Sequence, residues 1–247
     1  MKTSTHDRIR FEGIPTSEEV MERTLAEGRD ILLAFSTGKD AVLAWMALRD
    51  AGFTVHPYYM FSVPDLQFVE RSLQAFEKHF GRRIMRVPQP SFYRMLNNFV
   101  FQPPERCAVI EKLGLPEFTL DQLRDCIVKD LKLPPGTWSA SGVRASDSLM
   151  RRTHFRTNGP VNQKRRMIYP VWDVRKGELV DRILAEGVPM PVDYQLFGRS
   201  FDGIDFRFLA QIQIHFPDDY ARILEWFPLA ELELKRFEYA QKDLAKR

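Results

Sequence analysis

Apolar and polar residues follow two different periods along the first third of the chain. Residues 31–35 form an uncharged apolar run, residues 53–60 are rich in β-forming side chains, and residues 83–87 make a third strand-like segment. Between them, residues 41–48 and 65–81 carry helical patterns. Strands that alternate with helices imply right-handed crossovers, so the pattern predicts an α/β fold with a mostly parallel sheet and helices on both faces.

Local signals predict further elements on either side of this series. Thr16 and Glu19 fit a capping box that opens a helix, and Gly28 ends it. Several prolines separate the predicted helices in the middle of the chain. The remaining predicted elements are helices at 91–98, 105–113, 119–131 and 176–187, strands at 137–141 and 167–171, a basic loop at 151–166, and helices from residue 206 onward.

Two domains are expected from this order. Residues 1–205 of the 247-residue chain hold the whole strand and helix series, and we expect them to form one α/β domain. Residues 206–247 are expected to form a helical C-terminal extension, with Leu229, Leu232 and Phe237 among its apolar positions. The extension is predicted to pack on the domain, and a homodimer interface is the alternative.

Composition is that of an ordinary soluble globular protein. Hydrophobic residues make up 44% and charged residues 28% of the chain, and the formal net charge of +3 is too small to indicate nucleic-acid binding by itself. Two cysteines cannot make a disulfide framework, and the N-terminus has no apolar run. We therefore expect a reduced, cytoplasmic protein without a membrane span. The five histidines lack metal-ligand spacing, so no zinc is expected.

A candidate anion site follows the apolar run at 31–35. Ser36, Thr37 and Gly38 form a small turn before the predicted helix, and Lys39 and Asp40 follow them. The first N–H groups of a helix lack intrahelical partners and attract an anion, and Lys39 adds a full charge. The turn therefore predicts a phosphate cradle, in which Asp40 either orients Lys39 or only favours the helix N-terminus. The Walker and dinucleotide glycine patterns are both absent.

A second candidate motif follows the predicted strand at 137–141. Gly142 and Arg144 come just past the end of that strand, where ligands bind in open α/β sheets. Ser148 and the paired Arg151 and Arg152 follow within the same stretch. Both motifs are therefore expected at the carboxyl ends of strands.

Both motifs resemble those of a known enzyme family. Residues 36–41 are similar to the S-[GT]-G-K-D-S loop, and residues 142–148 to the G-[IV]-R-A-x-[ED]-S motif, of the PP-loop enzymes in the branch named after phosphoadenosine phosphosulfate (PAPS) reductase. Ala41 departs from the family's second Ser, and Val174 from its Trp. Weaker matches lie at residues 65–71, 169–173 and 189–200.

The resemblance implies a Rossmann-like fold of the HUP type, the adenine nucleotide α-hydrolase class, with the nucleotide across the carboxyl edge of the sheet. It implies that Lys39 and Arg144 are the catalytic residues, through charge stabilisation. Glu70 and Asp173 are candidates for a ribose or metal contact. The residues expected to bind nucleotide and phosphate are Ser36, Thr37, Gly38, Lys39, Asp40, Gly142, Arg144, Ser148, Arg151 and Arg152.

Cysteine chemistry separates this chain from the reductases of that family. They use a thiolate in a C-terminal E-C-G-[IL]-H motif, whereas no cysteine follows Cys126 here and Cys107 stands alone. Neither that nucleophile nor an iron–sulfur cluster is expected. The reaction that the resemblance still allows is attack of an acceptor on the α-phosphate of ATP, which adenylates the acceptor and releases pyrophosphate. Mg²⁺ is expected to bind with the ATP, and no metal site made by protein residues alone is expected.

Two alternatives and one open question remain. The chain could bind or reduce a sulfonucleotide, PAPS or adenylyl sulfate (APS), with a thiol from a partner protein. It could also be a non-catalytic nucleotide-binding module, which Ala41 and Val174 favour. The sequence does not identify the acceptor. A nucleic acid could bind the basic loop 144–166, or this stretch could be only a solvated loop. The seven basic residues there are Arg144, Arg151, Arg152, Arg156, Lys164, Arg165 and Arg166.

Overall fold

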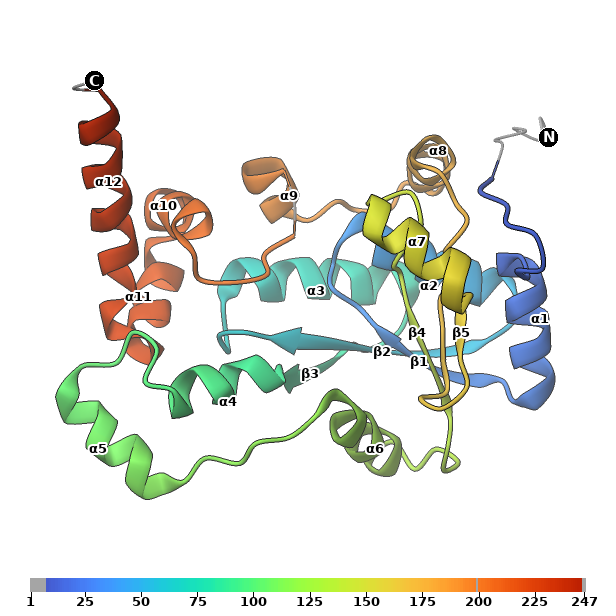
Figure 1. Ribbon diagram of the computed structural model, residues 1–247, viewed down its shortest axis with the longest axis horizontal. Coiled ribbons are helices and arrows are strands. Elements are labelled where there is room, and N and C mark those ends of the chain that lie inside the picture. The colour runs from blue at the N-terminus through green and yellow to red at the C-terminus, as the bar shows by residue number, and fades with distance from the viewer. Residues whose placement is uncertain (1–7, 199, 246–247) are drawn as a thin grey trace. The chain divides into compact units, whose positions relative to one another are not determined.

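The strands form a six-stranded, mostly parallel sheet in the order β3-β2-β1-β4-β6-β5 (Figure 1). The computed structural model describes residues 8–198 and 200–245. Strand β1 pairs in parallel with β2 and β4, β4 pairs in parallel with β6, and β5 runs antiparallel to β6. The strands are β1 (Asp30–Ala34), β2 (Thr54–Phe61), β3 (Met85–Pro88), β4 (Trp138–Ser141), β5 (Val161–Asn162) and β6 (Met167–Ile168).

Helices occupy most connections between these strands, except the turn from β5 to β6, and the C-terminal part of the chain. The predicted fold class, α/β with a mostly parallel sheet and C-terminal helices, is confirmed. Within the described ranges, no helix is both long enough and apolar enough to span a membrane. The helices are α1 (Ser17–Glu27), α2 (Lys39–Asp50), α3 (Gln67–Phe80), α4 (Pro90–Asn97), α5 (Pro104–Leu113), α6 (Leu120–Asp130), α7 (Leu149–Asn158), α8 (Lys176–Glu186), α9 (Val192–Phe197), α10 (Phe206–His215), α11 (Pro217–Trp226), the 3₁₀ helix η1 (Pro228–Ala230) and α12 (Glu231–Ala245).

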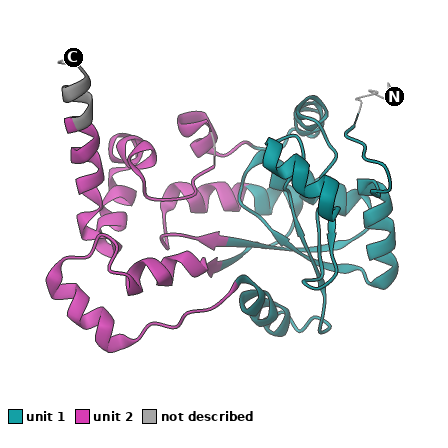
Figure 2. Ribbon diagram, in the orientation of Figure 1, with its two compact units in different colours: residues 1–59, 76–86, 120–189 teal, residues 60–75, 87–119, 190–247 magenta. Residues whose placement is uncertain are grey.

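The chain divides into two compact units, each with more contacts within itself than with the other (Figure 2). Unit 1 comprises residues 1–59, 76–86 and 120–189, and unit 2 comprises residues 60–75, 87–119 and 190–247. The division concerns compactness and not independent folding. The domain boundary expected between residues 205 and 206 therefore stays a prediction.

Unit 1 holds the central strands, and helices cover both of their faces. Successive residues of a strand point to opposite faces of the sheet. Trp138 of β4 donates its indole N–H to Glu27 of α1 over 3.0 Å, whereas the next residue, Ser139, accepts a bond of 3.3 Å from Arg124 of α6. Helices α1 and α6 therefore pack on opposite faces, as predicted for a three-layer arrangement.

Aromatic side chains make up much of the core of unit 2. The ring of Phe68 stacks on that of Phe216 with centroids 4.9 Å apart, and meets Phe201 edge-on. Asp219 accepts hydrogen bonds from the backbone N–H groups of Gln67 (2.6 Å) and Phe68 (3.0 Å), which ties α11 to the first turn of α3. The C-terminal helices thus pack within this unit, and a homodimer interface stays a prediction.

The basic stretch differs from its prediction. Residues 149–158, expected as loop, form α7, which begins at the N-cap Ser148 and ends before Gly159. Phe155 is the one residue of α7 that is fully buried. A helix with a single buried position carries almost no apolar periodicity, so the polar sequence concealed it.

Smaller differences concern the ends of elements. The last predicted strand, 167–171, is only Met167–Ile168, and Pro170 follows it closely. Strand β5, which lies in the stretch predicted as a loop, and helix α9 were not predicted. The helical stretch from residue 206 is interrupted where Pro217 and Pro228 begin new helices, because proline cannot donate the hydrogen bond that would continue the preceding one.

Candidate anion-binding site

The turn from β1 into α2 presents unpaired backbone donors. Gly38 is the N-cap of α2 and makes no side-chain cap. Among the described residues, no backbone carbonyl accepts from the N–H groups of Ser36, Thr37 or Gly38. Three successive free donors at a helix N-terminus, with the positive end of the helix dipole behind them, are the elements of an anion site.

Thr37 has a strained backbone in the middle of this turn. Its φ is 61°, in the left-handed region that a β-branched residue rarely adopts, and its side chain is buried. The Thr37 hydroxyl donates to the carbonyl of Ser36 over 2.6 Å. Such strain persists only where surrounding packing fixes the backbone, and it is concentrated at ligand-binding turns. In this structure Thr37 shapes the turn, whereas Ser36 is exposed beside it.

Gly142 brings the second motif against the first. A Cβ atom at this position would lie 2.4 Å from the carbonyl oxygen of Asp40 and 2.7 Å from the backbone nitrogen of Ala41. Both neighbours are backbone atoms of the first turn of α2, so they cannot move aside without moving the helix. The loop after β4 and the turn after β1 therefore touch, and the contact requires glycine.

Arg144 lies beneath the turn and is engaged on several sides. Its side chain is 3% exposed. The guanidinium Nε is 2.7 Å from Asp40 Oδ1, as an ionic contact without an aligned hydrogen bond. Nη2 donates to Asp147 Oδ1 over 2.7 Å, and Nη1 to the carbonyl of Val174 over 3.2 Å. Arg144 thus ties α2 to two loops, and a direct contact with a ligand, which stays a prediction, would require these bonds to open.

The charged side chains form an alternating series. Lys39 Nζ is 3.5 Å from Asp40 Oδ2, and Asp147 pairs with Arg144 and, over 2.8 Å, with Arg151. Three cations and two carboxylates leave one positive charge in excess. Lys39 is 31% exposed at the solvent end of the series, beside the free N–H groups.

Asp147 is a site residue for which the sequence analysis assigned no role. It lies three residues after Arg144 and four before Arg151 and pairs with both. An acid between two arginines at these spacings was the available signal. Ser148 accepts from the Arg151 N–H over 3.2 Å as the N-cap of α7, and Arg152 is exposed on that helix.

Asp173 is buried away from solvent. Its carboxylate accepts from the Ser17 hydroxyl (2.6 Å) and N–H (3.1 Å), and Arg8 is 3.7 Å away. Burial raises the pKa of Asp173, although the bonds from Ser17 oppose this shift. These contacts anchor the start of α1. A ribose or metal contact stays a prediction for Asp173, and also for Glu70, which belongs to unit 2.

Of the seven basic residues at 144–166, four are paired. Arg144 and Arg151 pair as described, Arg165 lies 3.4 Å from Asp121, and Arg166 lies 3.0 Å from Glu27. Arg152, Arg156 and Lys164 are exposed and form no ion pair within the described ranges. The charge available to an outside polyanion is therefore smaller than the sequence suggests.

The side chains that bind metals or act as thiol nucleophiles are scattered in the described part of the chain. No group of three or more His, Cys, Asp or Glu side chains is placed there to hold a metal ion. Cys107 is half-buried on α5 and Cys126 exposed on α6. Neither cysteine lies on an element that builds the turn or the loop after β4.

Comparison with known proteins gives similarity in fold. No family model and no curated protein sequence matches the chain. The chain is similar to the crystal structure of a phosphoadenylyl-sulfate (PAPS) reductase from Candida auris in complex with phosphate, with 10% identity, a TM-score of 0.48, and coverage of 76% of this chain and 88% of that one. It is also similar to a predicted subunit of tRNA methyltransferase from Methanocaldococcus jannaschii, with 16% identity, a TM-score of 0.32, and coverage of 62% and 73%. At such identities and scores the similarity concerns the α/β fold alone.

Proposed function

We propose that the chain binds an adenine nucleotide at the turn formed by Ser36, Thr37 and Gly38. The observation that carries this proposal is the set of three backbone N–H groups without acceptors, at the carboxyl end of β1 and the start of α2. Lys39 and the helix dipole add positive charge at the same point. Adenine as the base rests on the resemblance of both motifs to PAPS reductase-like PP-loop proteins.

The reaction in this proposal is adenylation. An acceptor oxygen or sulfur attacks the α-phosphorus of ATP, the bond from that phosphorus to the bridging oxygen breaks, and pyrophosphate leaves. Lys39 and the N–H groups would stabilise charge on the leaving pyrophosphate, because donors fixed by the fold need no reorganisation during the reaction. When bound with the triphosphate, Mg²⁺ supplies further charge neutralisation.

Arg144 has a positioning part in this proposal. It fixes Asp40, whose carboxylate neighbours Lys39, and it fixes the loop that carries Ser148 and Arg151. Ser148, Arg151 and Arg152 would close the site from the side of α7. A nucleic acid as the acceptor stays part of the proposal through Arg152, Arg156 and Lys164, which are not neutralised within the described chain.

The test is a thermal-shift series on the full chain with Mg·ATP, Mg·AMP, APS and PAPS, followed by assays for pyrophosphate and sulfite. A ligand at about 100 times its dissociation constant stabilises the folded state by about 2.7 kcal/mol. We expect a shift with ATP that Lys39→Ala removes and Lys129→Ala, an exposed lysine on α6, retains. Pyrophosphate release with an acceptor supports adenylation.

Other outcomes would replace the proposal. A shift with APS or PAPS alone, and sulfite release on adding a thiol protein, would assign sulfonucleotide reduction. Tight ATP binding without turnover would assign a non-catalytic module. No shift with any nucleotide, or equal shifts in Lys39→Ala and the parent chain, would remove the site itself.

A further inference from the structure

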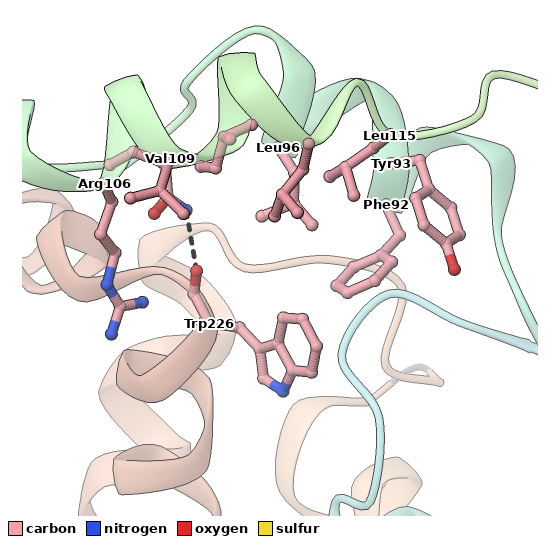
Figure 3. Close-up of a pocket in the computed structure, with 10 residues that line it drawn as sticks. Phe92, Tyr93, Leu96, Arg106, Val109, Leu115 and Trp226 are labelled. Atoms are coloured by element: carbon pink, nitrogen blue, oxygen red, sulfur yellow. Dashed lines mark hydrogen bonds between the residues drawn. The ribbon is translucent and has the colours of Figure 1, made fainter.

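A cavity lies in unit 2 and shares no residue with the anion site. It has a volume of about 450 Å³, within the range typical of small-molecule pockets. Helix α4, helix α5 and the end of α11 surround it, and Figure 3 shows their side chains converging on one space. The residues that line it are Phe92, Tyr93, Leu96, Gln102, Arg106, Val109, Ile110, Leu113, Leu115 and Trp226.

Three hydrogen bonds fix the walls of this cavity. The amide of Gln102 donates to the carbonyl of Trp226 over 2.7 Å, the bond drawn in Figure 3. The N–H of Leu229 donates to the carbonyl of Phe101 over 3.0 Å, and Arg106 donates to that of Glu225 over 2.5 Å. The segment 101–106, which ends the α4–α5 connector and begins α5, is thus tied at three points to the segment 225–229, which ends α11 and begins η1.

The cavity is lined by apolar surface that the fold leaves uncovered. Helix α5 has no buried residue, and its Val109 and Leu113 are 57% and 65% exposed. On the opposite wall, the rings of Phe92 and Trp226 meet at 67° with centroids 5.1 Å apart. An apolar ligand would remove this surface from water, which is the main favourable contribution to binding at such sites.

One cation sets the polarity of the ligand. Arg106 is the one charged residue among the described side chains that line the cavity, and it forms no ion pair there. It lies at the opposite end of the row of labelled side chains from Tyr93 (Figure 3). A molecule with an apolar body and one anionic group could contact the apolar walls and pair with Arg106.

Backbone strain next to the cavity is an independent sign of a constrained site. Phe99 and Phe101 both have a φ of 54°, in the left-handed region that bulky side chains rarely adopt. Both lie just before Gln102 in the connector from α4 to α5. Strain of this kind is held in place by surrounding packing and is concentrated at ligand-binding segments.

From these observations we propose that the cavity binds an amphiphilic anion, an apolar or aromatic body of one to two rings, or an equivalent alkyl chain, that carries a single carboxylate or sulfonate. The apolar body lies between Phe92, Ile110 and Trp226, and the anionic group meets Arg106. This site is separate from the proposed nucleotide site, so either proposal can fail alone.

The test uses 8-anilinonaphthalene-1-sulfonate, a fluorescent apolar anion, on the full chain. Energy transfer falls steeply with the distance between donor and acceptor, and Trp226 lines the cavity. Trp226 should therefore be the main donor to a dye bound there, and Trp226→Phe should remove most of the transfer. We expect saturable binding of one dye per chain. Arg106→Gln should weaken it about tenfold, since a charge-assisted bond is lost, and Arg236→Gln on α12 should leave it unchanged.

A second variant fills the space instead of removing the charge. Ile110→Trp should abolish binding, and because α5 buries no residue the substitution should leave the circular dichroism spectrum unchanged. Competition by dodecanoate or by 1-naphthoate identifies an alkyl or an aromatic ligand. Equal competition by neutral 1-naphthalenemethanol, unaltered affinity in both variants, unsaturable binding, or a dimer that Ile110→Trp dissociates would each overturn the proposal.

Discussion

Gly142 allows the two halves of the anion site to touch, because glycine has no Cβ atom. The loop after β4 lies so close to the first turn of α2 that any side chain at position 142 would overlap backbone atoms of Asp40 and Ala41. The close approach of this loop to α2 should therefore affect both the stability of the chain and the shape of the turn at 36–38.

At this scale we predict that Gly142→Ala destabilises the chain by about 1–3 kcal/mol, the cost of overpacking where backbone must move. It should also lower nucleotide affinity. Urea denaturation measures the first effect and thermal shift with ATP the second. The control is Gly203→Ala, because a Cβ there meets nothing within 4 Å, and less than about 0.5 kcal/mol is expected. Equal losses for both variants would disprove the role given to Gly142.

At the scale of the element, α7 depends on its ends. Its N-cap Ser148 accepts from the Arg151 N–H, Gly159 follows its last residue, and Phe155 is its buried anchor. Little else holds the helix, since its remaining residues are polar or exposed. Residues that were predicted to face the nucleotide therefore depend on a cap for their position.

We predict that Ser148→Ala lowers the stability of α7 by about 1 kcal/mol. Hydrogen exchange of the α7 amides should become faster, whereas Thr153→Ala in the same helix should not accelerate it. Ser148→Asp retains a capping oxygen and should restore protection. If Ser148 also contacts phosphate, Ser148→Asp will still weaken ATP binding through its charge, and unchanged affinity would restrict Ser148 to the cap.

At the scale of the whole molecule, one buried carboxyl group links stability to pH. Asp173 joins the segment after β6 to the N-terminus of α1 through Ser17, and burial raises its pKa. Compared with the unfolded chain, the folded state therefore holds the proton of Asp173 more tightly. The resulting stabilisation is fully present below the pKa of the unfolded chain and is lost as pH rises through the folded pKa.

We therefore predict that the parent chain loses stability relative to Asp173→Asn as pH rises from about 4 to 7.5. The amide keeps an acceptor for Ser17 and does not ionise in this range. Urea denaturation across the pH series gives the difference in unfolding free energy. Asp125→Asn, at an exposed position on α6, should run parallel to the parent chain, and a parallel curve for Asp173→Asn would refute the linkage.

Much of the fold could be predicted because its signals are local. The capping box at Thr16 is present as predicted, with its side chain accepting from Glu19, and the apolar run at 31–35 is the centre of the sheet as β1. Helix α7 was missed because periodicity needs more than one buried position. The pairing of Arg144 was missed because its partners lie at residues 40, 147 and 174, and no spacing along the chain connects all three.

The sequence by itself determined most of the order of strands and helices, but not α7, β5 or α9. It also determined which turns follow parallel strands, since propensity, capping and hydrophobic period act over a few residues. It also supplied the free donors of the turn at 36–38, because they follow from where a helix begins. Only the tertiary structure decided which charges are exposed. It buried Arg144 and Asp173, left Lys39 at the surface, and brought α4, α5 and α11 together around an apolar cavity, because burial and charge pairing depend on contacts between distant segments.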